Sequence, residues 1–213
     1  NVPDRPDLVA MHRRMRGKLR GFLDPPEQTL RQYRADDRHI EARYARSIAL
    51  TRANEVEEAL RIVDALLAEA PEDPFRHELK GDILRKAGWV SKAIESYETA
   101  VRILPWAALI RVHLAHLQIE LGDPVSTEKA LENLDHALRY ERDMPGAWRI
   151  AATGYGRLGN RGMTALALAE EAFLRNNKKA ARSNAERALK LLPQGSPGAF
   201  QAQDILSATE KEE

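Results

Sequence analysis

The sequence contains no cysteine, few aromatic residues and no long apolar segment. The lack of cysteine excludes a disulfide framework and every thiolate metal site. No apolar run is longer than Trp106 to Ile110, so no membrane span is predicted. The charges nearly balance, with 33 Lys and Arg against 32 Asp and Glu, and the pI is about 8.2. This balance, together with an aromatic content of only 6%, argues against nucleic acid as a partner.

The 213 residues are enough for one globular unit or one repeat array, and their abundant alanine and leucine favour an all-helical chain. The first residues, Asn1 to Pro6, contain neither an initiating Met nor the apolar core of a signal peptide. We therefore expect the chain to be a domain excised from a longer product.

An internal period separates a repeat array from a bundle, and this chain has one. Ser47, Gly81 and Ala115 recur every 34 residues, which is the length of the tetratricopeptide repeat. One copy fills six positions of that pattern with small, large, small, aromatic, small and proline residues, in the order Gly81, Leu84, Ala93, Tyr97, Ala100 and Pro105. The small residues let two helices approach closely, and the proline ends the second helix.

The period predicts an all-α, right-handed superhelical tetratricopeptide-repeat solenoid. Residues 40–213 form an array of about four to five helix pairs, and residues 1–39 form an amphipathic connector helix and a linker. A late pair is expected near residues 163–175 and 178–191. A last helix from Pro197 to about Thr209 caps the array, because an end repeat must cover its neighbour's apolar face.

The N-terminal segment carries one narrow apolar stripe at helical spacing, formed by Leu8, Met11, Met15, Leu19 and Phe22. We expect the stripe to pack on the first repeat or to pair with a second molecule. Gly17 and Gly21 weaken a free helix, so they indicate close packing against another surface. The segment is either a helix that caps the first repeat or a connector docked on a missing upstream domain.

Two sets of residues resemble metal ligands, and neither makes a convincing site. His77 and Glu78 begin an H-E-x-x-H pattern, but Gly81 stands where the second zinc ligand belongs. His113, His116 and Glu120 lie on one expected helix, and the outer pair is too far apart to share an ion comfortably. We predict no catalytic residue, no metal ligand and no cofactor in this chain.

Four stretches resemble the C-terminal region of bacterial zinc metallopeptidases, in the group that includes the periplasmic β-barrel assembly-enhancing protease. They are Met15-x-x-Lys18-Leu19-x-Gly21-Phe22-Leu23, Phe75-x-His77-Glu78-Leu79-Lys80-Gly81, Tyr155-Gly156-Arg157-x-Gly159, and Gly195-Ser196-Pro197 followed by Asp204-Ile205-Leu206. The resemblance implies a tetratricopeptide module that follows a zinc peptidase domain, with the zinc in that absent domain. It also implies a periplasmic or cell-envelope location, outer-membrane assembly components as partners, and a role in protein quality control.

A solenoid binds partners on its concave face, which the first helix of each pair lines. In the 34-residue frame the partner-binding groove is formed by Tyr44, Ile48, Glu78, Asp82, Arg85, Val112, His116, Arg149 and Thr153. Tyr44 and Ile48 stand where chaperone-binding repeats that clamp a carboxylate have lysine and asparagine, so we expect recognition of an extended or partly folded protein segment instead. Alanine at Tyr44 or Arg149 should weaken binding with little loss of stability.

Two functions fit this sequence. The first is a non-catalytic interaction domain that holds substrate or partner proteins for an attached zinc metallopeptidase. The alternative is a free-standing tetratricopeptide scaffold or adaptor with no protease.

Overall fold

A computed structural model of the chain describes residues 6–210, with side chains described from residue 8 to residue 209. This part of the chain forms twelve α-helices and no strand, so the predicted all-α class is confirmed. Its helices divide between two compact units, Asn1–Leu104 and Pro105–Glu213, which are described here as unit 1 and unit 2. The predicted boundary between residues 39 and 40 stays a prediction.

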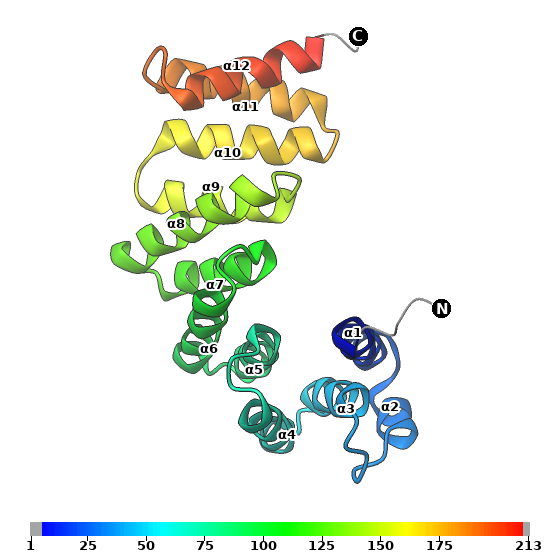
Figure 1. Cartoon of the computed structure of the whole chain (residues 1–213). Helices are drawn as coiled ribbons and strands as arrows, with labels where there is room; N and C mark the ends of the chain where they lie inside the picture. Colours follow the sequence, from blue (N-terminus) through cyan, green and yellow to red (C-terminus); the bar gives the residue numbers. More distant parts are fainter. Residues whose placement is uncertain (1–5, 211–213) are drawn as a thin grey trace. The chain divides into compact units, whose positions relative to one another are not determined.

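Unit 1 contains α1 (Pro6–Leu23), α2 (Pro26–Gln32), α3 (Ile40–Arg52), α4 (Val56–Glu69), α5 (Pro74–Lys86) and α6 (Val90–Ile103). Helix α3 packs on α4, α4 on α5 and α5 on α6, as expected of two consecutive helix pairs (Figure 1). Alanines with no exposed surface stand where the helices cross, at Ala59 and Ala93. A Cβ atom on Gly81 would lie 2.8 Å from the ring of Tyr97, so the small residue is needed for this ring to fit between α5 and α6.

Unit 2 contains α7 (Ala108–Leu121), α8 (Pro124–Tyr140), α9 (Pro145–Arg157), α10 (Arg161–Leu174), α11 (Lys178–Leu191) and α12 (Pro197–Glu210). Each helix packs on the next one in the chain, and α12 also contacts α10. Helix α12 buries Ala202 and Ile205 against this neighbouring pair. The helices expected near 163–175 and 178–191, and the capping helix after Pro197, are confirmed.

The turns between paired helices repeat with the same period as the helices. Asn54, Gly88 and Gly122 lie 34 residues apart and have φ of 65°, 76° and 82°. This left-handed backbone is one that glycine and asparagine adopt more readily than other residues. After the third turn the side chain of Asp123 accepts a hydrogen bond from the backbone of Ser126 at 2.8 Å and so caps α8.

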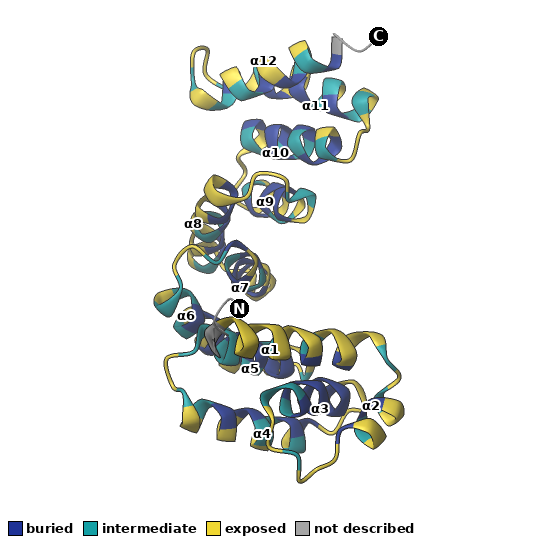
Figure 2. Cartoon of the chain, turned by 45° about the vertical axis from the view of Figure 1, so that its right-hand side comes forward, coloured by how far each residue is buried: buried dark blue, intermediate teal, exposed yellow. Residues whose placement is uncertain are grey.

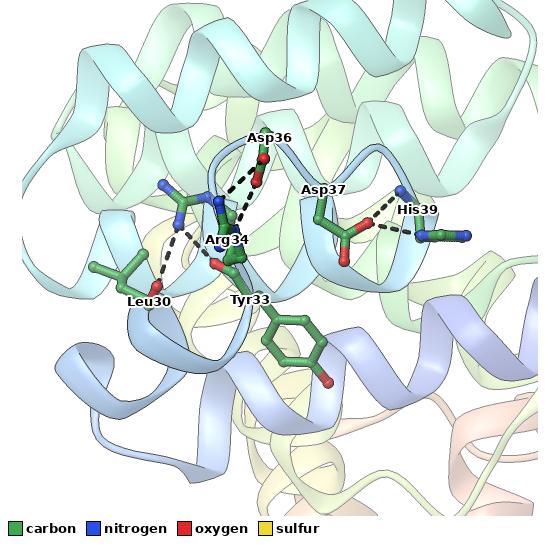
Figure 3. Close-up of polar contacts among 7 residues, drawn as sticks. Leu30, Tyr33, Arg34, Asp36, Asp37 and His39 are labelled. Atoms are coloured by element: carbon green, nitrogen blue, oxygen red, sulfur yellow. Dashed lines mark hydrogen bonds and ion pairs between the residues drawn. The ribbon is translucent and has the colours of Figure 1, made fainter.

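The sequence did not predict α2, whose seven residues are too few to show a helical period. The buried Arg46 of α3 anchors the C-terminal end of α2, since its guanidinium donates to the Leu30 and Tyr33 carbonyl oxygens at 3.4 and 2.8 Å. Figure 3 shows Leu30 and Tyr33 at this end of α2. Nearby, Asp37 accepts a hydrogen bond from the backbone of His39 at 2.9 Å. These contacts fix the short loop that leads into α3.

Helix α1 packs on α3 through its small residues, as the glycines predicted. A Cβ atom on Gly17 would collide with the backbone of Glu41, and one on Gly21 would lie 2.7 Å from Ile48 Cβ. The first repeat does not cover the apolar stripe, because its five side chains remain between 46% and 51% exposed. The other expectation, that the stripe pairs with a second molecule, stays a prediction. Figure 2 shows exposed residues along the length of α1, beside the mostly buried α3.

Candidate partner-binding groove

Helix α1 covers part of the predicted groove in unit 1. Ile48 lies against Gly21, and the buried Glu78 accepts a hydrogen bond from Lys18 Nζ at 2.9 Å. Tyr44 is only 1% exposed. Tyr44 and Glu78 are therefore buried inside unit 1, where a partner could not contact them without a rearrangement. Ile48 touches α1 at Gly21 and also lines an open pocket.

Tyr44 sits in a polar surrounding that leaves its hydroxyl without a hydrogen bond among the described residues. Burial raises the pKa of Tyr44, and the nearby Asp73 carboxylate raises it further, while Arg14 and Arg76 oppose the shift. Arg14 itself reaches Asp73 at 3.6 Å and lies 3.9 Å above the Phe75 ring. The cluster joins α1, α3 and α5 and contributes to the packing of unit 1.

An apolar pocket of about 250 Å³ remains open beside the C-terminal end of α1. Its apolar walls come from Ile48 in α3 and from Leu79 and Ile83 in α5, with the half-exposed Phe22 at its edge. The full lining is Phe22, Ile48, Thr51, Arg52, Leu79, Asp82, Ile83, Arg85 and Lys86. The pocket lies within unit 1 and includes three residues of the predicted groove, Ile48, Asp82 and Arg85.

The polar residues around this pocket carry mostly positive charge. Asp82 accepts a hydrogen bond from the Tyr97 hydroxyl at 2.6 Å and lies 4.0 Å from Arg85. Burial, and then Asp82, raises the pKa of Tyr97, so this hydroxyl stays protonated and donates. Arg52 donates to the carbonyl oxygens at the end of α1. Three cationic residues, Arg52, Arg85 and Lys86, line the pocket, and its one carboxylate, that of Asp82, already accepts a hydrogen bond from Tyr97. The surroundings of the pocket therefore favour an acidic group on a partner.

The predicted groove residues of unit 2 lie on α7 and α9. Val112 is buried, and His116 faces Glu120 at 3.6 Å on the surface. Arg149 pairs with Glu171 at 2.7 Å, and the Thr153 hydroxyl donates to the Arg149 carbonyl at 3.2 Å. Three of these four residues, His116, Arg149 and Thr153, are therefore exposed, and each already has a polar contact within unit 2.

The sequence did not predict several residues of the pocket in unit 1 and of the surface around Arg149 in unit 2. Glu171 has a side chain only 4% exposed, and it is held between Arg149 and Arg175, at 2.7 and 3.0 Å. Its position in an alanine-rich helix gave no sign of this role. Phe22 was recognised as part of the apolar stripe, whereas its place at a pocket depends on how α1 folds back.

Among the described residues, no group of three metal-ligating side chains lies close enough together to hold an ion, so His113, His116 and Glu120 do not form such a group. His77 contacts the Pro71 carbonyl oxygen at 2.7 Å. None of the described helices is long and apolar enough to cross a membrane.

Comparison with known proteins gives a fold and no family. No protein-family model matches the chain, and no curated protein matches it. The solved structure of MamA MSR-1 C2 is similar, with 16% identity, a TM-score of 0.60 and coverage of 80% of this chain and 99% of that one. MamA of Desulfovibrio magneticus RS-1, from residue 41 to its end, has 14% identity and a TM-score of 0.57 over 78% and 89%. At these identities the similarity concerns the fold alone.

Proposed function

We propose that unit 1 binds an exposed segment of another protein. The carrying observation is the open apolar pocket among α1, α3 and α5, with basic side chains around it. An apolar side chain of the partner would enter between Ile48, Leu79 and Ile83. An acidic group next to it in the partner would approach Arg85 and Lys86. Apolar anchors of this kind carry most of the affinity, while charges fix orientation.

The test is a titration with an acetylated peptide that has one leucine between two glutamates, observed by methyl NMR. We expect the methyl signals of Ile48, Leu79 and Ile83 to shift. Arg85→Glu combined with Lys86→Glu should weaken binding at least fivefold. The control is Arg102→Glu, which makes the same change of charge at one exposed site on α6, away from the pocket lining. Shifts confined to other methyl groups would place binding elsewhere and reject this pocket.

We further propose that the chain is the partner-binding part of a zinc metallopeptidase of the cell envelope. The support is the sequence resemblance of the four stretches described above. Two of these stretches meet in unit 1, because Lys18 pairs with Glu78. This contact stabilises the fold, so these two stretches also have a structural role. Outer-membrane assembly components as partners belong to this proposal as well.

This second proposal is tested by the coding sequence upstream of Asn1, where it expects a helix with H-E-x-x-H. If that domain exists, pocket variants of the full-length enzyme should slow processing of a folded substrate and leave cleavage of a small peptide nearly unchanged. If the upstream sequence has no such motif, the free-standing scaffold is the better description.

A further inference from the structure

Helix α1 supplies or contacts three of the residues that line the pocket of unit 1. Phe22 belongs to α1 and stands at the edge of the pocket. Ile48 packs against α1 at Gly21, where a Cβ atom would lie 2.7 Å from Ile48 Cβ. Arg52 Nη1 donates to the Gly21 and Asp24 carbonyl oxygens at 2.7 and 2.6 Å. The shape of the pocket therefore depends on the position of α1.

Arg52 connects the end of α1 to the pocket. The last carbonyl groups of a helix have no partner within that helix, and α1 ends at Leu23. The Arg52 guanidinium donates to one of these carbonyl oxygens, at Gly21, and the same side chain lines the pocket. If α1 left α3, Arg52 would lose its acceptors and the pocket would lose the edge that Phe22 forms.

Helix α1 is held on α3 and α5 by close backbone approach at its glycines and by charged pairs. Arg16 and Lys18 pair with Glu41 and Glu78 at 3.1 and 2.9 Å. The large side chains of the apolar stripe add little to this packing, because they remain about half exposed. A helix that buries few large apolar side chains can open locally at a lower cost than the core of its domain.

We propose that the docked position of α1 sets the affinity of the pocket for its partner, and that a bound partner in turn holds α1 on α3. This inference rests on the proposed function of the pocket. A ligand between Ile48, Leu79 and Ile83 contacts Phe22 only while α1 is docked, so it binds the docked arrangement more tightly. Because coupling of this kind is reciprocal, the ligand stabilises the docked arrangement by the same factor.

The first test is amide hydrogen exchange of the parent chain, without and with the acetylated peptide that has one leucine between two glutamates. Without peptide, the amides of α1 from Met15 to Leu23 should exchange faster than those of α4, which contributes no residue to the pocket lining. With peptide at ten times its Kd, the α1 amides should exchange at least threefold and at most about tenfold more slowly. Exchange in α1 as slow as in α4 without peptide, or unchanged by peptide, would overturn the proposal.

Substitutions on the two sides of α1 test the coupling from the other direction. Gly17→Leu places a large side chain against the Glu41 backbone, where a Cβ atom alone would collide, and Gly17 is not part of the pocket lining. This variant should weaken peptide binding at least fivefold without a change of charge. The control is Met15→Ala on the exposed side of α1, which should alter the affinity less than twofold. Equal affinities of the parent and Gly17→Leu would contradict the proposal.

Phe22→Ala provides a second variant in case Gly17→Leu does not fold, because it leaves the glycine contacts with α3 in place. It should lower the affinity at least threefold and reduce the effect of the peptide on exchange in α1. Peptide-induced shifts of the Ile48, Leu79 and Ile83 methyl signals in the parent, with no change of exchange in α1, would reject this inference and leave the proposed function standing. The absence of those shifts would reject both.

Discussion

Lys18 in α1 donates a hydrogen bond to the carboxylate of Glu78 in α5 at 2.9 Å. The two residues are 60 positions apart in the sequence, and their contact ties the N-terminal helix to the second helix pair. Glu78 is nearly covered, with its side chain 9% exposed. A carboxylate so placed needs its partner, because a buried charge without compensation is costly.

Lys18→Met should therefore destabilise unit 1 by about 1–3 kcal/mol, the cost of leaving a mostly buried acceptor without its partner. Urea unfolding followed by circular dichroism measures this change. Adding Glu78→Leu should recover much of the loss, because two apolar groups often replace an ion pair at little cost. If Lys18→Met unfolds like the parent, the pair is not a stabilising link between α1 and α5.

Two glycine positions allow a comparison of packing with helix propensity. Gly17→Ala should lower stability by roughly 1–3 kcal/mol, because the new methyl group would meet the Glu41 backbone. Gly146→Ala in α9 meets no atom within 4 Å and should raise stability by up to about 1 kcal/mol. Thermal melting of both variants tests whether Gly17→Ala lowers the melting temperature and Gly146→Ala raises it. A stabilising Gly17→Ala would mean that α1 does not approach α3 this closely.

The repeats could be predicted from the sequence because the residues that define each repeat lie close together in the chain. Small residues such as Gly81 and Ala93 mark helix crossings, and a proline such as Pro105 ends a helix, wherever the neighbours lie. The course of α1 was not predictable in the same way. The rule that apolar residues face inward gave the wrong side for Met15, because backbone approach at Gly17 and Gly21 decided the packing instead.

The groove could be predicted only by position in the repeat. That frame assigned Asp82 and Arg85 to the groove, and both line the pocket. It also assigned Tyr44 to the groove, although Tyr44 is buried. It contained no information that Lys18, on a helix outside the repeat, would pair with Glu78. A long-range contact of this kind has no periodic signal in the sequence.

Glu170 in α10 offers a pH test of unit 2. Burial raises the pKa of its carboxyl above the usual range, Arg142 opposes this shift and Asp204 adds to it. The stabilising contribution of a group with a raised pKa is complete below its unfolded-state pKa and is lost as the pH rises through the folded-state pKa. We expect Glu170→Gln to melt above the parent at pH 7 and the difference to disappear near pH 4.

The exposed Glu132→Gln is the matched control for this test and should change little at either pH. A lower melting temperature for Glu170→Gln at pH 7 would contradict the prediction. It would show that the contact with Arg142 at 4.0 Å outweighs the cost of burial.

Two substitutions at Tyr44 distinguish a structural role from a binding role. The sequence suggested that Tyr44→Ala would weaken binding and leave stability nearly intact. Since the ring is 1% exposed, this change should instead cost about 3–5 kcal/mol, as for other large buried aromatic side chains. Tyr44→Phe keeps the ring and removes a hydroxyl that has no hydrogen-bond partner among the described residues, so it should be neutral or stabilising by up to about 1 kcal/mol.

Arg149→Ala is the useful contrast in unit 2, because the Arg149 side chain is 61% exposed and Arg175 still contacts Glu171 after its removal. We expect it to cost less than Tyr44→Ala. Chemical unfolding of the three variants and the parent, under one set of conditions, measures all of these differences. If Tyr44→Ala proved as stable as the parent, the Tyr44 ring would not be buried in solution, and the face around it would then be open to a partner.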